Sequence, residues 1–106
     1  GPMIVYISFD YDILKKIIEM DSKAVTQYLN GDKSPKELKA DKISGADYHL
    51  SVFQKKPEWI DEAKKSKIVL NAWTVNKAED MQWLLSKGFD YITTNEPELL
   101  FEITRK

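Results

Sequence analysis

Residues 68–97 read IVLNAWTVNKAEDMQWLLSKGFDYITTNEP and contain a strand pattern, a helix pattern and a second strand pattern. Residues 68–75 and 89–94 are rich in β-branched and aromatic residues, which favour strands. Between them, Asn76 is a helix start signal, and Gly88 is placed to end the helix in a left-handed conformation. The inward side of this helix would carry Met81, Leu84 and Leu85. This order predicts two parallel strands, because parallel neighbours need a crossover connection.

The same unit recurs along the whole chain. Five strand-like stretches begin 20 to 23 residues apart, which leaves room for one helix and two short loops between neighbours. They are residues 4–9, 24–29, 47–52, 68–75 and 89–94. Helix start signals follow them, namely Asp10 or Asp12, the capping box Ser34-Pro35-Lys36-Glu37, Pro57, Asn76 and Asn95. The sequence therefore predicts an α/β fold of about five parallel strand–helix units, with residues 42–47 as an irregular surface loop.

Composition limits the possible functions. The 106 residues form one domain at most, and 42% hydrophobic residues are enough for a folded core. The formal net charge of −1 provides no overall field that would attract nucleic acid. The chain has no cysteine, which excludes disulfides, thiolate metal sites and a cysteine nucleophile. No apolar run approaches the ~18 residues of a membrane span.

Three strand ends carry motifs of one known family. Ile7-Ser8-Phe9-Asp10, Trp73-Thr74-Val75-Asn76 and residues 92–97 (ITTNEP) occur in this order, and the last two lie about one helix apart. With these motifs the chain resembles the glycerophosphodiester phosphodiesterases over essentially its whole length. That family folds as an eight-stranded βα barrel, and this chain is similar to strands four to eight. Residues 3–106 are therefore expected to be the C-terminal part of a TIM-type barrel, while residues 1–2 resemble a tag remnant.

The resemblance also implies an enzymatic activity, and it shows which catalytic motifs of the family do not occur in this sequence. The family hydrolyses glycerophosphodiesters to glycerol phosphate and an alcohol, using Ca²⁺ or Mg²⁺ held by carboxylates and two histidines as acid and base. Its His-Arg-Gly, Glu-x-Asp and Glu-x-Lys motifs belong to the first three strands and do not occur here. We therefore expect no catalytic residue and no metal ligand in this chain, and no activity from it alone. It is either part of such a hydrolase or a natural half-barrel that serves as a non-catalytic binding or assembly module.

Trp73 and Phe9 are the candidate substrate-binding residues. Trp73 shares a strand face with Asn71, and a polar residue in mid-strand indicates that this face points into the barrel interior. Trp73 also approaches the carboxyl end of its strand, where barrel enzymes gather their sites. By the resemblance, both aromatic residues lie near the wall that receives the alcohol or glycerol part of the substrate. The alternative is core packing; for Phe9, Val5 and Ile7 on the same face favour a position against the helices.

His49, the only histidine, lies between Asp47 and Ser51 on one predicted strand. The three side chains would share a face, but alternate residues are about 6.5 Å apart along a strand, which argues against a catalytic triad. We expect His49 to line the barrel mouth or to bond a backbone group. Most acidic residues, together with Asn76 and Asn95, fall at or near helix starts, where capping accounts for them.

Five strands of an eight-stranded barrel would leave two open sheet edges and an uncovered interior face. Such edges can pair with a second copy of the same chain or exchange elements with it. We therefore expect self-association, as a dimer or a swapped dimer, or pairing with the missing N-terminal half of the barrel.

Overall fold

A computed structural model describes residues 3–105, so the proposed tag remnant at residues 1–2 lies outside the described residues. Strands and helices alternate along the chain. The strands are β1 (Val5–Ser8), β2 (Val25–Tyr28), β3 (Gly45–His49), β4 (Val69–Trp73) and β5 (Tyr91–Ile92). The helices are α1 (Tyr11–Met20), α2 (Pro35–Ala40), α3 (Leu50–Lys55), α4 (Glu58–Ser66), α5 (Ala78–Ser86) and α6 (Pro97–Thr104).

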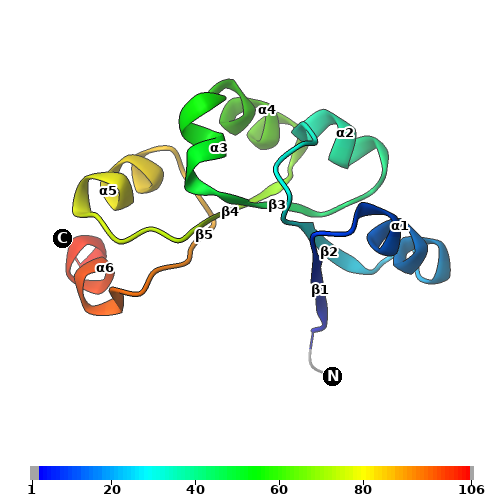
Figure 1. Ribbon diagram of the computed structural model, residues 1–106, viewed down its shortest axis with the longest axis horizontal. Helices are drawn as coiled ribbons and strands as arrows, with labels where there is room; N and C mark the ends of the chain where they lie inside the picture. The colour runs from blue at the N-terminus through cyan, green and yellow to red at the C-terminus, as the bar shows by residue number, and fades with distance from the viewer. Residues whose placement is uncertain (1–2, 106) are drawn as a thin grey trace.

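The five strands form one parallel sheet in the order β1-β2-β3-β4-β5, so the predicted class of parallel strand–helix units is confirmed. The elements form an arch in which the helices lie on the outer, convex side and the strands on the inner side (Figure 1). Strands β1 and β5 are the two edges, and within the described part of the chain each pairs with one neighbour only. The sheet is therefore an open arc.

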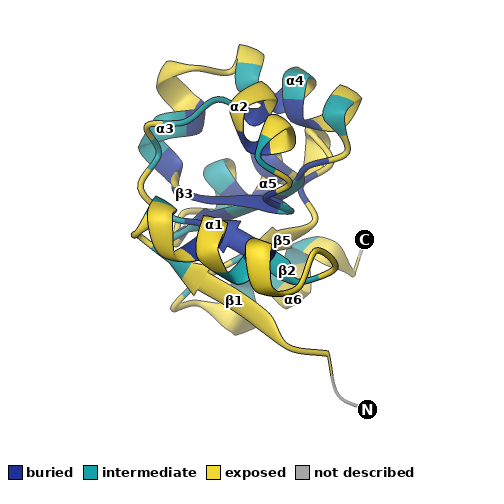
Figure 2. Cartoon of the chain, turned by 90° about the vertical axis from the view of Figure 1, so that its right-hand side faces the viewer, coloured by how far each residue is buried: buried dark blue, intermediate teal, exposed yellow. Residues whose placement is uncertain are grey.

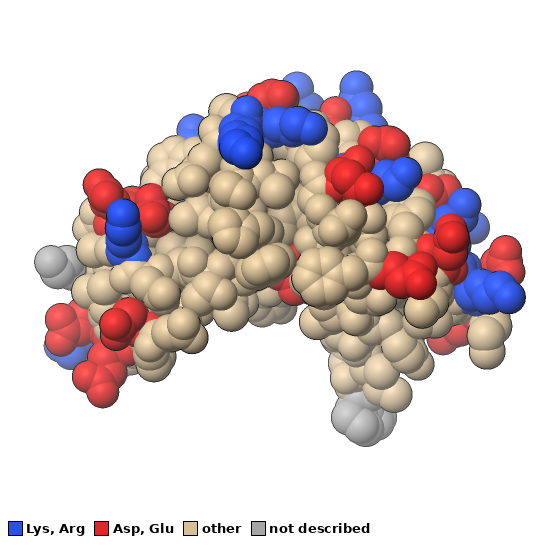
Figure 3. Space-filling model, in the orientation of Figure 1, with Lys and Arg blue, Asp and Glu red and all other residues tan. Residues whose placement is uncertain are grey.

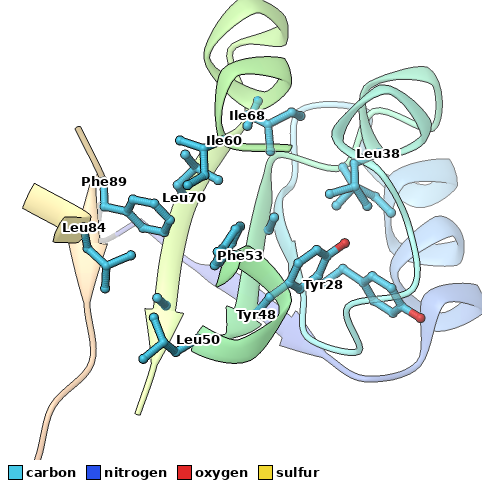
Figure 4. Packing of buried hydrophobic residues seen from close by; sticks show 14 of the residues in the cluster. Tyr28, Leu38, Tyr48, Leu50, Phe53, Ile60, Ile68, Leu70, Leu84 and Phe89 are labelled. Carbon is cyan, nitrogen blue, oxygen red and sulfur yellow. The ribbon is translucent and has the colours of Figure 1, made fainter. Parts of the chain in front are cut away.

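The hydrophobic core lies between the sheet and the helices. Leu70 and Ala72 of β4 are fully buried, whereas Asn71 and Trp73, on the opposite face, are partly exposed. Leu70 lies among core side chains from several elements, including Phe53 of α3 and Leu84 of α5, in Figure 4. Burial of apolar surface at about 25 cal/mol per Å² makes this helix-facing side the main source of stability.

Several predicted helix boundaries are confirmed. The Asp10 side chain accepts a hydrogen bond from the Ile13 amide and caps α1. Ser34 and Glu37 form the predicted reciprocal capping box of α2, with N···O distances of 3.2 and 2.9 Å. Gly88 follows α5 with φ +77°, a left-handed conformation that glycine adopts without steric cost.

The third strand differs from the prediction. It begins at Gly45 and ends at His49, and residues 50–55 form α3, so the expected strand over residues 47–52 was wrong at both ends. Leu50 and Phe53 are one helical turn apart, and both are buried against the core. The start of β3 favours glycine, because a Cβ atom at position 45 would lie 3.0 Å from Gln27 Cγ and 3.2 Å from Val69 O.

The expected surface loop over residues 42–47 was also wrong. Ile43 is buried in the core, and the Ser44 amide donates to the carbonyl oxygen of Thr26. Residues 42–44 therefore lead directly into β3, and the polar neighbours Lys42 and Ser44 concealed this buried isoleucine from the sequence pattern.

Asn76 and Asn95 do not cap helices. Helix α5 begins at Ala78 after Lys77, and α6 begins at Pro97 after Glu96, both without a side-chain cap. Instead, Asn76 Oδ1 accepts hydrogen bonds from the Asn95 amide (2.9 Å) and the Thr94 hydroxyl (3.3 Å). Asn76 therefore joins the loops that follow β4 and β5.

Charged side chains of both signs lie over the helices along the outer edge of the arch, and the inner edge of this face is mostly uncharged (Figure 3). None of the helices in residues 3–105 has the length and apolar character needed to cross a membrane.

Candidate substrate pocket on the concave face

Strand register determines which side chains face the inside of the arch. Partners in a parallel ladder lie on the same face of the sheet, and alternate residues return to that face. Asp47 pairs with Asn71, which pairs with Tyr91, and two residues further along the strands His49 pairs with Trp73. These residues lie on the face opposite the core residues of β3 and β4. The prediction that Asn71 and Trp73 point away from the helices is confirmed.

A pocket of about 350 Å³ lies at the carboxyl ends of the strands on this face. Its size falls at the lower end of the range for small-molecule sites. Residues in or directly after all five strands line it: Phe9, Leu29, Asp47, Trp73, Thr74 and Thr93. The pocket thus brings together the two predicted substrate-binding residues, Phe9 and Trp73, with a carboxylate and two hydroxyl groups.

The Trp73 ring is held by contacts from β3 and from Phe9, which follows β1. Its Nε1–H donates a 2.8 Å hydrogen bond to the backbone carbonyl of Asp47. The Phe9 and Trp73 rings are edge-to-face, with centroids 6.2 Å apart, and the His49 ring meets the indole edge-on at 5.1 Å. The peptide bond between Trp73 and Thr74 is cis. These contacts fix the orientation of the indole in the pocket wall.

Phe9 does not pack against the helices. It directly follows β1 and is 57% exposed, so the alternative of a helix-facing core position was wrong. Val5 and Ile7, its neighbours on the same strand face, are also exposed. In the view of Figure 2, β1 is exposed over most of its length. The alternating apolar residues of β1 therefore mark the concave face, which the helices do not cover.

Asp47 is the pocket residue whose importance the sequence did not reveal. The residue is 6% exposed, and its Oδ1 atom has no hydrogen-bond partner among the described residues. Desolvation by burial raises the pKa of this carboxyl to about 6. The available signal was a charged residue inside a strand whose neighbours, Ala46 and Tyr48, are apolar.

His49 and Ser51 form a local hydrogen-bonded unit. His49 Nδ1 lies 2.8 Å from Ser51 Oγ and accepts a 3.1 Å hydrogen bond from the Ser51 amide at the start of α3. The expectation that His49 bonds a backbone group is confirmed. Within residues 3–105, Asp47 Oδ1 has no partner and does not orient the imidazole, so the arrangement does not match the nucleophile–base–orienter order of a catalytic triad.

Sequence comparison decides the family. Residues 1–99 match the profile of the Glycerophosphoryl diester phosphodiesterase family. The chain belongs to this family. A glycerophosphodiester phosphodiesterase from Caldanaerobacter subterraneus subsp. tengcongensis is 38% identical over 58 residues, which are 55% of this chain and 24% of that protein.

Solved structures of the glycerophosphodiester phosphodiesterase family have the same fold. The crystal structure of the enzyme from Parabacteroides distasonis matches with a TM-score of 0.89 and 39% identity, over 94% of this chain and 42% of that one. A phosphodiesterase from Oleispira antarctica, solved with the product sn-glycerol-3-phosphate, shares the fold at TM-score 0.77 and 18% identity, over 96% and 42% of the two chains. The chain thus spans about two-fifths of the length of these barrel relatives, and the predicted partial barrel is confirmed.

The family is in general metal-dependent, so the pocket is a candidate site for a hard cation. Ca²⁺ and Mg²⁺ take six or more oxygen ligands, with carboxylates as the main protein donors. Asp47 is the only carboxylate in the pocket lining. In residues 3–105, no three His, Cys, Asp or Glu side chains are grouped as metal ligands would be. The residues on this face therefore do not fit the metal centre of the family.

Proposed function

We propose that this chain supplies one wall of the active-site pocket of a metal-dependent glycerophosphodiester phosphodiesterase, corresponding to the C-terminal part of its barrel. In this proposal Trp73 and Phe9 contact the alcohol or glycerol part of the substrate. Hydrolysis to glycerol phosphate and an alcohol also needs residues that this chain lacks, so the chain alone is inactive.

The observation that carries this proposal is the Phe9–Trp73 pair. The two residues are 64 positions apart in the sequence, yet their rings meet at the carboxyl ends of the strands, where barrel enzymes build their sites. An exposed phenylalanine at this position contributes little to core packing. Contact with the carbon chain of a substrate gives this side chain a role.

The divalent cation has to be held by residues outside this chain. The donor set on the concave face, one carboxylate with neutral amide and hydroxyl groups, cannot supply the oxygen ligands that Ca²⁺ or Mg²⁺ requires. We therefore propose that Ca²⁺ or Mg²⁺ is bound by the N-terminal part of the barrel and faces the pocket wall formed here.

A complementation assay tests the proposal. This chain is mixed with an N-terminal barrel fragment of the Parabacteroides distasonis relative, and divalent-metal-dependent hydrolysis of a glycerophosphodiester is measured. We expect hydrolysis from the mixture, none from this chain alone, and loss of activity when the cation is chelated. Hydrolysis by this chain alone, or an inactive mixture in which the two fragments form a one-to-one complex, would contradict the proposal.

The role of Trp73 is tested in the same assay with a matched pair of variants. Trp73→Ala should lower kcat/KM by about tenfold or more, because a stacking or apolar contact to the substrate is lost. Trp83→Ala removes a half-buried indole from α5 and should change kcat/KM much less once folding is verified.

The second candidate is a non-catalytic half-barrel module that binds a partner or assembles with itself. The apolar exposure of β1, with Val5, Tyr6 and Ile7 each at least 39% exposed, favours this candidate. The complementation assay separates the two, because a pure assembly module gives no metal-dependent hydrolysis in any mixture.

A further inference from the structure

A second pocket lies at the opposite end of the sheet, where the chain enters β3 and β4. Its volume is about 390 Å³, within the range of small-molecule sites. Val69 at the start of β4 lines it, whereas Trp73 at the end of β4 lines the pocket on the concave face, and a strand of this length spans roughly 13 Å between the two. We call this separate site the amino-end pocket. Three lysines and two serines contribute to its lining, namely Lys39, Lys42, Lys67, Ser22 and Ser44.

Two copies of one local motif build the pocket. After α2 the Ile43 amide donates to the carbonyl oxygen of Leu38, and after α4 the Ile68 amide donates to the carbonyl oxygen of Ala63, both at 2.9 Å. Such bonds between residues five apart are typical of a helix that ends in a Schellman motif. Both isoleucines are buried, and α2 and α4 lie side by side on the outer side of the arch (Figure 1). The two helix ends are therefore fixed to the core next to each other.

In both copies the residue before the isoleucine is a lysine with a left-handed backbone. Its φ angle is 64° at Lys42 and 58° at Lys67. Glycine is the usual residue at such a position, because it adopts this conformation without steric cost. The helix dipole favours basic residues in the last turn, but Lys39 of α2 and Lys64 and Lys65 of α4 already supply them. Each helix therefore carries a further lysine at a backbone cost, and what this lysine adds is a charged side chain in the pocket.

No acidic group of the chain neutralises these lysines. The salt bridge found within residues 3–105 joins Lys36 and Glu62, so none of the three pocket lysines takes part in it. Asp21 and Asp41, the aspartates adjacent to the lining in sequence, are not among the lining residues, and both accept hydrogen bonds from groups outside the pocket. Like charges that gather without a counter-charge repel one another. A bound anion would turn this repulsion into attraction.

The donors of the pocket suit the oxygens of a phosphate group. Each lysine ammonium offers three N–H donors, and hydrogen bonds between charged groups are the stronger kind. Ser44 Oγ accepts a 3.1 Å hydrogen bond from the Thr26 amide, which leaves its O–H free to donate to a ligand. We propose that the amino-end pocket binds the phosphate group of a small phosphorylated ligand through Lys39, Lys42 and Lys67.

This site does not depend on the proposed function. Strands β3 and β4 each have a neighbour on both sides, so pairing at the open edges β1 and β5, with a second copy or with the rest of a barrel, takes place elsewhere on the sheet. The lysines of the amino-end pocket do not line the concave pocket. Failure of the phosphate site would therefore leave the proposed function as it stands, and the reverse is also true.

The test is an NMR titration of the 106-residue chain near neutral pH with sodium phosphate, sodium pyrophosphate and, at matched ionic strength, sodium chloride. We expect saturable shifts of the Ser22 and Ser44 amide signals with phosphate, at least about threefold tighter binding of the more highly charged pyrophosphate, and no saturable shift with chloride. The Trp73 indole signal should stay in place, which separates this site from the concave pocket. No saturable shift, or equal shifts at lysines all over the outer surface, would overturn the proposal.

Charge-removing variants link the binding to the pocket. Lys42→Gln and Lys67→Gln should each weaken phosphate binding about threefold or more, and the double variant about tenfold or more. Lys87→Gln is the matched control, because Lys87 is also an exposed lysine directly after a helix but has φ −88° and lies outside the pocket lining. It should leave the affinity unchanged. Equal weakening in all three single variants would show that phosphate responds only to the total charge, and the proposal would be wrong.

Glycine variants distinguish a binding role of the two lysines from a purely structural one. Lys42→Gly and Lys67→Gly relieve the left-handed backbone, so both should raise the midpoint of urea denaturation in sodium chloride. Phosphate stabilises proteins in general through exclusion from their surface, and this part is common to the wild type and the variants. The additional stabilisation of the wild type by bound phosphate should fall by half or more in each glycine variant. Glycine variants that gain as much from phosphate as the wild type does would overturn the proposal.

Discussion

The carboxyl group of Asp47 ties folding stability to pH. Burial raises its pKa from 3.8 to about 6, so the folded chain holds the proton more tightly than the unfolded chain. The resulting stabilisation is complete below about pH 4 and is lost as pH rises through about 6. The rise in the pKa of Asp47 corresponds to a free energy of unfolding of roughly 3 kcal/mol as an upper limit. We predict that Asp47→Asn is more stable than the wild type at neutral pH and similar to it near pH 3, measured by urea denaturation.

Asp47 is not the only carboxyl group that makes stability depend on pH. The prediction therefore concerns the difference in unfolding free energy between Asp47→Asn and the wild type. The hydrogen bonds from Ser34 lower the pKa of Glu37, and its contribution therefore has the opposite sign and is lost as pH falls. That contribution is common to the wild type and Asp47→Asn and cancels in their difference. Asp12→Asn, at an exposed first-turn position of α1, is the matched control and should change stability by less than about 1 kcal/mol. A pH-independent difference between Asp47→Asn and the wild type would contradict the assignment.

The pocket residues show how far sequence reasoning reaches at this scale. The position of Trp73 was predictable, because Asn71 on the same strand face distinguishes the concave side from the core side. Phe9 was ambiguous, because Val5, Ile7 and Phe9 give the same alternating pattern for a strand packed on helices and for one lining a barrel interior. The unpaired oxygen of Asp47 could not be predicted, since it depends on the absence of donors from five separate strand ends.

At the scale of elements, the loops after β4 and β5 are joined by Asn76. We predict that Asn76→Ala destabilises the chain by about 1 kcal/mol, because its Oδ1 accepts two hydrogen bonds. The hydrogen-exchange protection of the Asn95 amide should fall in the same variant. Asn95→Ala keeps the backbone N–H that donates to Asn76, so it serves as the matched control and should have little effect. If both asparagines capped helices, the two substitutions would instead cost similar amounts.

The ends of helices were predictable where a side chain forms a hydrogen bond with the backbone of a nearby residue in the sequence. Asp10 and Ser34 do so at the starts of α1 and α2, and Gly88 ends α5 through its own backbone freedom. The end of β3 was not predictable in this way. Residues 50–55 contain valine and phenylalanine, which favour strands, but the burial of Leu50 and Phe53 one turn apart stabilises a helix. Tertiary packing therefore determines that residues 50–55 form a helix.

At the scale of the molecule, the open arc exposes apolar surface at both edges. Ile7 and Phe9 at β1 are 51% and 57% exposed, and Tyr91 of β5 is 60% exposed. Unpaired strand edges with apolar side chains promote pairing with another chain. We predict that the 106-residue chain self-associates at tens of micromolar, measured by light scattering coupled to size exclusion. A clean monomer under these conditions would contradict the prediction.

The surface that drives this association can be located with two isoleucines of nearly equal exposure. Ile7 on β1 is 51% exposed and Ile13 on α1 is 50% exposed. Ile7→Lys places a charge on the concave face beside the open edge and should weaken association about tenfold or more, because a lysine ammonium is costly to bury without a partner. Ile13→Lys changes a helix position and should leave association unchanged.

In the proposed enzyme the same edges pair with the N-terminal part of the barrel, so adding that fragment should convert the self-associated chain into a one-to-one complex. Persistence of the homo-oligomer in the presence of excess fragment would show that the two associations use different surfaces.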